Sequence, residues 1–351
     1  MKPRVENIHT DTLNEHLWSG IIGRSESGKS REEDTIHVES KQELYKVINK
    51  IVSDENKPKG SIIDLNRIDV SNLTDMSYLF SYPLQNFNYK LDLWDVSNVE
   101  NMSGMFDGCK YFNCDISKWK ASPSKMARMF KDCKKFNQDL SGWDVSKVNN
   151  MDYLFYNCTD FNQKLSGWDV SSVTSMMNMF KNCENFDQDL SSWNVSSVTS
   201  MMNMFKNCKN FNQDLSSWNV SGVKIMDDMF HGCENFNGNI SNWNVSSVHK
   251  TTSMFENCKE FNQDLSGWKL SNAEYTDAMF ENCEKFNCDL SKWKDSVDNI
   301  MVLSKMFLGC KSLDCDFDEW KLSNLSKYGK SAAFAGCDAL KKLPKWYNTT
   351  A

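Results

Sequence analysis

One segment of this 351-residue sequence has the composition of a phosphate-binding loop. Residues Gly23–Ser30 read GRSESGKS and match the pattern GxxxxGK[ST], in which backbone amides and a lysine hold phosphates and the last hydroxyl binds Mg²⁺. A working loop of this type needs a strand before it and a helix after it. Ile21 and Ile22 make a poor strand, and the acidic run after Ser30 has no apolar stripe. Nucleotide binding is therefore the weakest alternative, and we expect no cofactor.

Thirteen cysteines form a second group with reactive potential. Three stand apart, namely Cys114, Cys288 and Cys315. The other ten each follow a recurring phenylalanine by three residues: Cys109, Cys133, Cys158, Cys183, Cys208, Cys233, Cys258, Cys283, Cys310 and Cys337. None of these ten forms a CxxC pair, and no histidine lies in register with them, so a zinc site is not indicated. A column that points every thiol the same way favours buried thiols that pack as small hydrophobes over a ladder of disulfides or metal ions.

Histidines offer no catalytic constellation either. The five of them are scattered along the chain, at His9, His16, His37, His231 and His249. None stands beside a partnered nucleophile in the sequence, and the spacing of the acidic residues follows from the repeat described next. The sequence therefore predicts no catalytic residue, no metal site and no enzyme.

A repeat supplies the elements that position these residues. Tryptophans recur at spacings of 24 to 27 residues, and a phenylalanine column runs beside them. The columns are Trp94, Trp119, Trp143, Trp168, Trp193, Trp218, Trp243, Trp268, Trp293, Trp320 and Trp346, and Phe80, Phe106, Phe130, Phe155, Phe180, Phe205, Phe230, Phe255, Phe280, Phe307 and Phe334. Self-similarity at a fixed period indicates units that stack into a solenoid, because one unit buries too little apolar surface to fold alone.

Residues 171–193 show the repeat unit most clearly. Val173, Met176 and Phe180 follow the i, i+3, i+7 spacing of the apolar stripe of a short helix. In the segment 186–190 the first and last residues are apolar and share a face if the chain is extended, which predicts one short strand. The predicted fold class is an α/β repeat solenoid with one short strand and one short helix in each repeat of about 25 residues.

Two polar columns run in register with the aromatic ones. The first holds Asn88, Asn113, Asn137, Asn162, Asn212, Asn237, Asn262 and Asn287, with Asp187 and Asp314 as substitutes. We interpret it as a structural ladder that satisfies backbone groups from coil to coil, with a ligand-binding ladder as the alternative. The second column is variable and mostly acidic. We take it as a candidate partner-facing stripe, made of Asp139, Lys164, Asp189, Asp214, Asn239, Asp264 and Asp289.

The ends of the array depart from the repeat. Residues 40–43 read SKQE, a capping box, and an apolar stripe follows it, so a helix is predicted at about residues 41–53. The predicted organisation has four parts: a polar, partly disordered segment at 1–31, an N-terminal cap at 32–60, a solenoid of about eleven repeats at 61–346, and a tail at 347–351.

Composition limits the classes of partner. The formal net charge of −7 and a pI of about 5.4 argue against binding to nucleic acid, which needs clustered basic charge. No apolar stretch has the length of a secretory signal or of a membrane helix, which predicts a cytoplasmic protein without membrane insertion. We expect a monomer.

The consensus of the repeat, roughly W-D/N-V-S-x-V-x-x-M-x-x-M-F-x-x-C-x-x-F-N-Q-D-L-S-x-W, resembles that of the BspA-like leucine-rich-repeat proteins. The closest branch is that of bacterial surface proteins with a 26-residue repeat, and the resemblance covers about residues 61–346. It implies a leucine-rich-repeat-like, right-handed coil, no catalytic residues, and adhesion at the cell surface. We therefore expect a non-enzymatic solenoid that binds a protein partner along an extended face. The alternative is a surface or secreted adhesin exported by a non-standard route.

Overall fold

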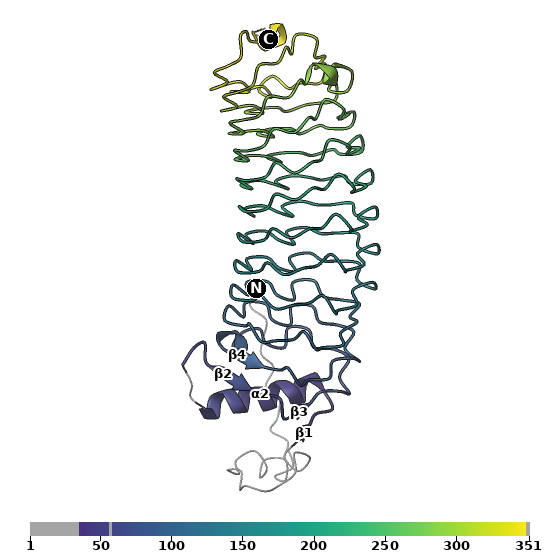
Figure 1. Ribbon diagram of the computed structural model, residues 1–351, viewed down its shortest axis with the longest axis vertical. Coiled ribbons are helices and arrows are strands. Elements are labelled where there is room, and N and C mark those ends of the chain that lie inside the picture. Colours follow the sequence, from purple (N-terminus) through teal and green to yellow (C-terminus); the bar gives the residue numbers. More distant parts are fainter. Residues whose placement is uncertain (1–34, 56–57, 349–351) are drawn as a thin grey trace.

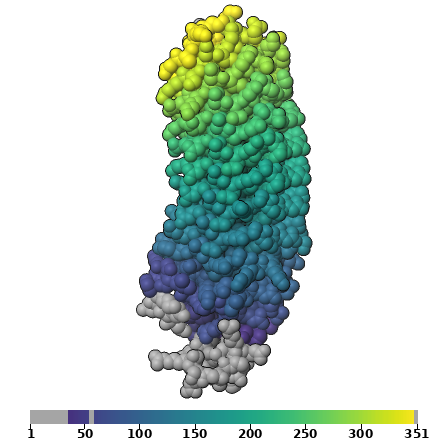
Figure 2. Space-filling view, viewed as in Figure 1, coloured from purple at the N-terminus to yellow at the C-terminus, as the bar shows by residue number. Residues whose placement is uncertain are grey.

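The computed structural model describes residues 35–55 and 58–348, and within them the chain winds into a column of stacked coils (Figure 1). The N-terminal coils lie at one end of the column and the C-terminal coils at the other, so the body is elongated (Figure 2). The predicted repeat solenoid is confirmed. The loop-like segment Gly23–Ser30 and the polar segment 1–31 lie outside the described residues.

Regular secondary structure is confined to the two ends and to one corner. The elements are β1 (Ile36–His37), α2 (Lys41–Glu55), β2 (Ile62–Asp64), β3 (Ile68–Asp69), η2 (Leu84–Asn86), β4 (Asn88–Lys90), η3 (Ser291–Asp295) and α3 (Lys345–Asn348). Strand β1 pairs with β3 and β2 pairs with β4, both in parallel. Helix α2 is the helix expected at about residues 41–53, and its N-terminus is capped where Ser40 Oγ accepts the N–H of Glu43 at 3.2 Å.

Helix α2 closes the N-terminal end of the column. Its apolar stripe, made of Leu44, Val47, Ile48 and Ile51, is buried together with the side chains of the first coils. The uncovered end of a stacked array would expose apolar side chains to water, and a capping element removes that cost. At the opposite end, Trp346 of α3 stacks on Trp320 with ring centroids 6.4 Å apart and extends the tryptophan column by one step.

The prediction of a short helix in each repeat is wrong, because no α-helix occurs in the described coils between β4 and α3. The segment of Met176 to Cys183 forms successive turns instead. Alternate N–H groups, such as those of Asn178 and Phe180, donate at 2.9 Å to carbonyls of the next coil, while those between them bond three residues back. From Phe106 to Phe334, the column phenylalanine rings of neighbouring coils lie 5.5–5.8 Å apart, whereas the axes of packed helices lie about 8–10 Å apart. A straight stack at this spacing leaves no room for a helix in each coil.

The prediction of a strand at positions 186–190 is also wrong for most coils. Among the described residues, only β2 and β4, in the first two coils, pair as a ladder at that position. In the later described coils the parallel bridges lie elsewhere, at the position of Ser175, which pairs with Asn150 on one side and Ser200 on the other. At the expected position an asparagine side-chain oxygen accepts the backbone N–H that would donate to a main-chain carbonyl in a strand ladder. The Oδ1 of Asn162, for example, accepts the N–H of Asp187 at 3.0 Å.

That contact recurs along the asparagine column and confirms its structural role. Each side-chain oxygen accepts the backbone N–H of the equivalent residue one coil later, at 2.8–3.1 Å, from Asn88 to Asp314. A carboxylate oxygen accepts such a bond as well as an amide oxygen does, which explains why Asp187 can stand in the column.

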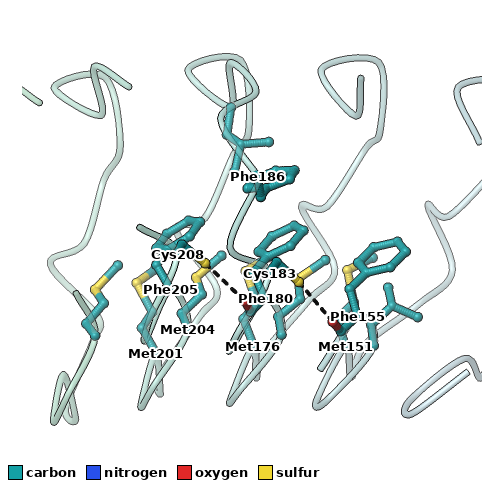
Figure 3. Close-up of a cluster of buried hydrophobic side chains, with 14 of the residues drawn as sticks. Met151, Phe155, Met176, Phe180, Cys183, Phe186, Met201, Met204, Phe205 and Cys208 are labelled. Atoms are coloured by element: carbon teal, nitrogen blue, oxygen red, sulfur yellow. Dashed lines mark hydrogen bonds between the residues drawn. The ribbon is translucent and has the colours of Figure 1, made fainter. Parts of the chain in front are cut away.

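Aromatic rings and thiols fill the core of the column (Figure 3). Phe180 stacks on Phe205 at 5.6 Å and contacts Phe186 within its own coil at 4.2 Å. Each repeat thiol donates to the carbonyl of the column phenylalanine one coil earlier, as Cys183 Sγ does to Phe155 O at 2.9 Å. All thirteen cysteines are free, and all but Cys337 are buried. The prediction of a buried thiol column is confirmed.

Candidate protein-binding face

The turns at positions 175–182 decide which side chains point outward. Met176, Met179 and Phe180 are buried in the core, whereas Met177 and Lys181 lie at the surface. We call the surface formed by the equivalents of residues 175, 177, 178 and 181, in the seven coils between residues 125 and 281, the variable face. Two of its members, Asn178 and Asn203, are buried. Two of its columns are Ala127, Asp152, Met177, Met202, Asp227, Thr252 and Asp277, and Lys131, Tyr156, Lys181, Lys206, His231, Glu256 and Glu281.

These outward columns contrast with the buried residues between them. The position of Phe180 is phenylalanine in every one of the seven coils, and that of Cys183 is always cysteine. The position of Lys181, next to that phenylalanine, carries basic, aromatic and acidic side chains in turn. The buried residues hold the backbone in one geometry, so the outward residues can differ from coil to coil without changing the fold.

The N-terminal half of the variable face carries an aromatic and basic patch, which we define as Arg128, Lys131, Tyr153, Tyr156 and Lys181. The guanidinium carbon of Arg128 lies 4.9 Å from the centre of the Tyr153 ring, within cation–π range. Tyr153 and Tyr156 lie 5.6 Å apart, and Tyr156 lies between the ammonium groups of Lys131 and Lys181, at 6.0 and 5.7 Å. All five side chains are half-buried, so the patch is held in place before any partner arrives.

Two cations of this patch have little electrostatic compensation. Burial and the neighbouring charge of Lys206 lower the pKa of Lys181 below its usual value. Arg128 Nε is buried and has no hydrogen-bond partner within the described residues. Lys131 differs, because its ammonium group pairs with Asp107 at 2.9 Å and with Asp132 at 2.7 Å.

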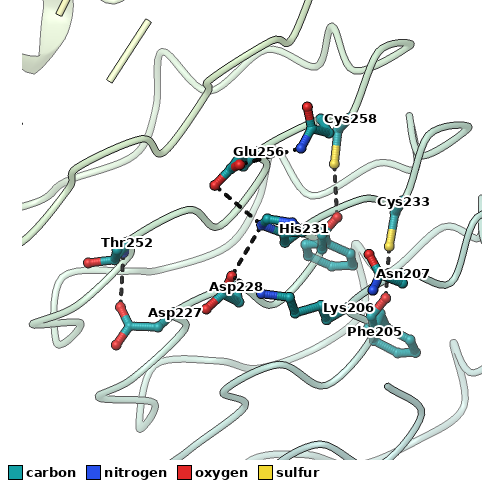
Figure 4. Close-up of polar contacts among 12 residues, drawn as sticks. Phe205, Lys206, Asn207, Asp227, Asp228, His231, Cys233, Thr252, Glu256 and Cys258 are labelled. Atoms are coloured by element: carbon teal, nitrogen blue, oxygen red, sulfur yellow. Dashed lines mark hydrogen bonds and ion pairs between the residues drawn. The ribbon is translucent and has the colours of Figure 1, made fainter. Parts of the chain in front are cut away.

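The C-terminal half of the face is acidic and has His231 at its centre (Figure 4). The Nδ1 atom of His231 lies 3.2 Å from Asp228 and 3.3 Å from Glu256, and the two carboxylates share this one position, so neither contact is a well-aligned hydrogen bond. Burial opposes the charged ring, but the two carboxylates outweigh it and raise the pKa of His231 to about 9. Asp228 also accepts a hydrogen bond from Lys206 at 2.6 Å.

The pKa values of two other carboxyl groups in this half shift in the opposite direction, although Asp227 accepts the N–H of Thr252 and Glu281 lies 3.9 Å from Lys305. Burial raises the pKa of Asp227, and burial together with the charge of Glu256 raises the pKa of Glu281. For Asp228, burial also works against the ionised form, but His231 and Lys206 outweigh it and hold the pKa of the carboxyl below its usual value. The acidic half therefore contains partly desolvated negative charge that a cation from outside would stabilise.

The stripe expected from the sequence lies in one column away from this face. Asp139, Lys164, Asp189, Asp214, Asp264 and Asp289 are exposed, and Asn239 is half-buried. The side-chain oxygen of every member except Lys164 accepts the backbone N–H of the serine two residues later, at 2.8–3.1 Å. These are Asx turns, and they give a structural reason for the mostly acidic composition of the column.

The variable face was missed in the sequence, although a signal for it is present. The residues on either side of the Met-Phe pair, which is Leu154-Phe155 in one coil, change from coil to coil. Asn182 and its equivalents have positive φ, 63° at Asn182 itself, a conformation that asparagine adopts more readily than most residues. The repeated asparagine at that position marked a turn, and the turn decides which columns face outward.

Catalytic or metal chemistry has no support in the described part of the chain. A shallow hollow of about 340 Å³ is lined by His249 and Glu274, 3.6 Å apart, but no nucleophile lines it. Across residues 35–55 and 58–348, no group of three or more His, Cys, Asp or Glu side chains is placed to hold a metal ion. None of the helices in these ranges has the length and apolar composition needed to cross a bilayer.

Comparisons with known proteins place the repeat in a family. The family model described as "Mycoplasma protein of unknown function, DUF285" matches residues 48–166, 124–238 and 226–347. No curated protein sequence matches the chain. Among solved structures, the TLR13–ssRNA13 complex is 15% identical with a TM-score of 0.28, and the match covers 80% of this chain and 46% of that one.

Two plant receptors give similar values. The peptide hormone receptor RGFR1, in complex with RGF2, is 10% identical with a TM-score of 0.22, covering 74% of this chain and 58% of the receptor. The leucine-rich-repeat ectodomain of an Arabidopsis thaliana membrane receptor kinase is 8% identical with a TM-score of 0.18, covering 73% and 42%. The match therefore covers less than two thirds of each of these three chains.

Proposed function

Since the chain belongs to the family described as "Mycoplasma protein of unknown function, DUF285", we propose that it is a non-enzymatic, protein-binding solenoid of the BspA-like repeat type. One observation carries the proposal: side chains vary on the variable face while the buried residues beside them stay the same. A fixed scaffold with one variable surface is the arrangement in which specificity changes without loss of the fold. In this proposal residues 32–60 form the cap, residues 61–346 the solenoid and residues 347–351 the tail.

The composition of the aromatic and basic patch supports a protein partner. Tyrosine, methionine and arginine are enriched at the centres of protein interfaces. Tyr153 and Tyr156 supply two rings, and Met177 and Met202 in the next two coils supply flexible apolar surface. Because all four side chains are already half-buried and the two tyrosine rings contact each other, binding would cost them little conformational entropy.

The candidate stripe, from Asp139 to Asp289, is retained as a second surface for a partner. Its carboxylates are exposed, but their Asx turns account for their residue type without a ligand. The variable face has no comparable structural explanation for its composition. We therefore propose the variable face as the primary contact surface.

Selection from a displayed peptide library against the immobilised full chain tests this assignment. Peptides captured by the wild type should be lost when Tyr153→Ala and Tyr156→Ala are combined. The matched control combines Asp189→Asn and Asp214→Asn, which keep the Asx acceptor, as Asn239 does naturally, and remove the charge. Loss of capture with the asparagine variant alone would move the site to the stripe. Unchanged capture with both variants would contradict a role for either surface.

The cellular location of this activity is a separate part of the proposal. The BspA-like resemblance favours an adhesin at the cell surface, and the alternative is an intracellular scaffold. Surface biotinylation of intact cells that express the protein distinguishes them. Labelling of the chain before lysis would support the adhesin, and labelling only after lysis would support an intracellular scaffold.

A further inference from the structure

The variable face is divided into two halves of opposite charge. The half between residues 125 and 206 carries five cations and, within its four columns, one carboxylate, Asp152. The cations are Lys125, Arg128, Lys131, Lys181 and Lys206. The half between residues 225 and 281 carries five carboxylates with Lys250 and His231 among them. These carboxylates are Asp227, Asp228, Glu256, Asp277 and Glu281.

The two halves are arranged almost symmetrically about the coil of Phe205. Three coils separate Phe205 from Phe130, and three separate it from Phe280, with steps of 5.5–5.7 Å throughout. The rings tilt by 11° or less from one coil to the next along this stretch, so the face stays nearly flat. A two-fold axis that runs along the coil of Phe205 would bring the outer basic coil, with Lys125, Arg128 and Lys131, against the outer acidic coil of a second molecule, with Asp277 and Glu281.

We propose that the variable face binds the same face of a second copy of this chain, with the two solenoids antiparallel. The inference rests on the proposed function, since it names the occupant of that face. The symmetry places Lys131 opposite Glu281 of the other copy and Arg128 beside Asp277 of the other copy. Near the axis, Met202 meets its own equivalent, and Lys206, which is already paired with Asp228 of its own chain, lies opposite the equivalent Lys206.

The dimensions of the face limit the dimer to a small interface. Six steps of about 5.6 Å give a length of about 34 Å between the outer coils. The eight residues from 175 to 182 would span about 23 Å if extended and span less as turns, so about 700 Å² per chain is an upper limit for the area of the face. Stable interfaces bury about 800 Å² on each partner. A long polyanion is a poorer fit, because the acidic half would repel it.

A charge exchange tests the proposal on the full chain. Sedimentation velocity at about 50 mM salt should show a dimer for the wild type, and about 500 mM salt should weaken it. Arg128→Glu alone and Asp277→Arg alone should each weaken dimerisation at least about tenfold, because each places like charges opposite one another twice. An equal mixture of the two variants should recover the dimer, because one contact is exchanged and the other is native.

The control and the contrary outcomes are equally definite. Lys147→Glu reverses an exposed charge away from the face and should leave the dimer intact. Recovery by mixing would show that both variants are folded. A monomeric wild type at 100 µM, single variants that stay dimeric, or a mixture that stays monomeric while circular dichroism shows both variants folded would each overturn the proposal. Peptide capture by the wild type and its loss in the tyrosine variant are measured separately, so the proposed function can stand if the dimer fails.

Discussion

The thiol of Cys208 donates a hydrogen bond of 3.0 Å to the carbonyl oxygen of Phe180 in the preceding coil. The same oxygen accepts the backbone N–H of Cys183 at 2.9 Å, so two coils share one acceptor. Burial raises the pKa of the Cys208 thiol well above its usual value. The cysteine column thus contributes to stacking, and its sulfur atoms are poor nucleophiles in the folded chain.

We therefore expect the native protein to resist thiol reagents. At pH 8 a colorimetric thiol reagent should label Cys337 first, since it is the most exposed of the cysteines. In denaturant all thirteen thiols should react. Rapid labelling of several thiols without denaturant would contradict the buried column, and a low total in denaturant would reveal disulfides.

The phenylalanine column should make stability depend on position. Phe205 stacks on Phe180 and on Phe230, both at 5.6 Å, whereas Phe334 lies near the end of the column and stacks on Phe307 at 5.5 Å. Phe205→Ala should lower the unfolding free energy by about 3–5 kcal/mol. Phe334→Ala should cost less, because it removes contacts to one neighbouring coil instead of two. Urea unfolding of both variants measures this, and equal losses would count against stacking as the source of stability.

The asparagine ladder predicts an unusual tolerance for one substitution. Asn162 Oδ1 accepts the N–H of Asp187 at 3.0 Å and the side-chain amide of Gln188 at 2.9 Å. Asn162→Ala removes both acceptor contacts and should cost about 1–2 kcal/mol. Asn162→Asp keeps the acceptor oxygen and should cost clearly less. Chemical denaturation of the pair gives the comparison, and an aspartate variant as unstable as the alanine variant would show that the acceptor is not what matters.

The sequence predicted the solenoid because stacking requires the same buried residue at the same place in every coil, and Phe180 and its equivalents record that directly. It did not predict the path within a coil. The i, i+3, i+7 spacing of Val173, Met176 and Phe180 fits a helix as well as it fits a series of turns. The difference lies in hydrogen bonds between coils, such as Asn178 N–H to Met202 O, which no local pattern specifies.

The candidate site was harder to predict for the same reason. Which columns face outward depends on the turns, so Lys181 and Glu256 could not be assigned to one surface without them. The column of Asp189 stood out in the sequence because it is regular, yet its regularity follows from an Asx turn that needs an acceptor at that position. On a repeat scaffold, regular columns indicate structure, and the columns that change are better candidates for recognition.

The charged cluster around His231 gives the last prediction, a pH dependence of stability. In the folded chain Asp228 and Glu256 raise the pKa of His231 to about 9, whereas the value in the unfolded chain is near 6.5. A raised folded pKa means that the stabilisation is complete below about pH 6.5 and is lost as the pH rises through about 9. The ring is partly exposed, so the loss should be on the order of 1–2 kcal/mol after solvent screening.

His231→Gln removes the titrating group, so the difference in unfolding free energy between wild type and variant should shrink between pH 6 and pH 9.5. A constant difference across that range would show that the carboxylates do not hold the ring in its charged form.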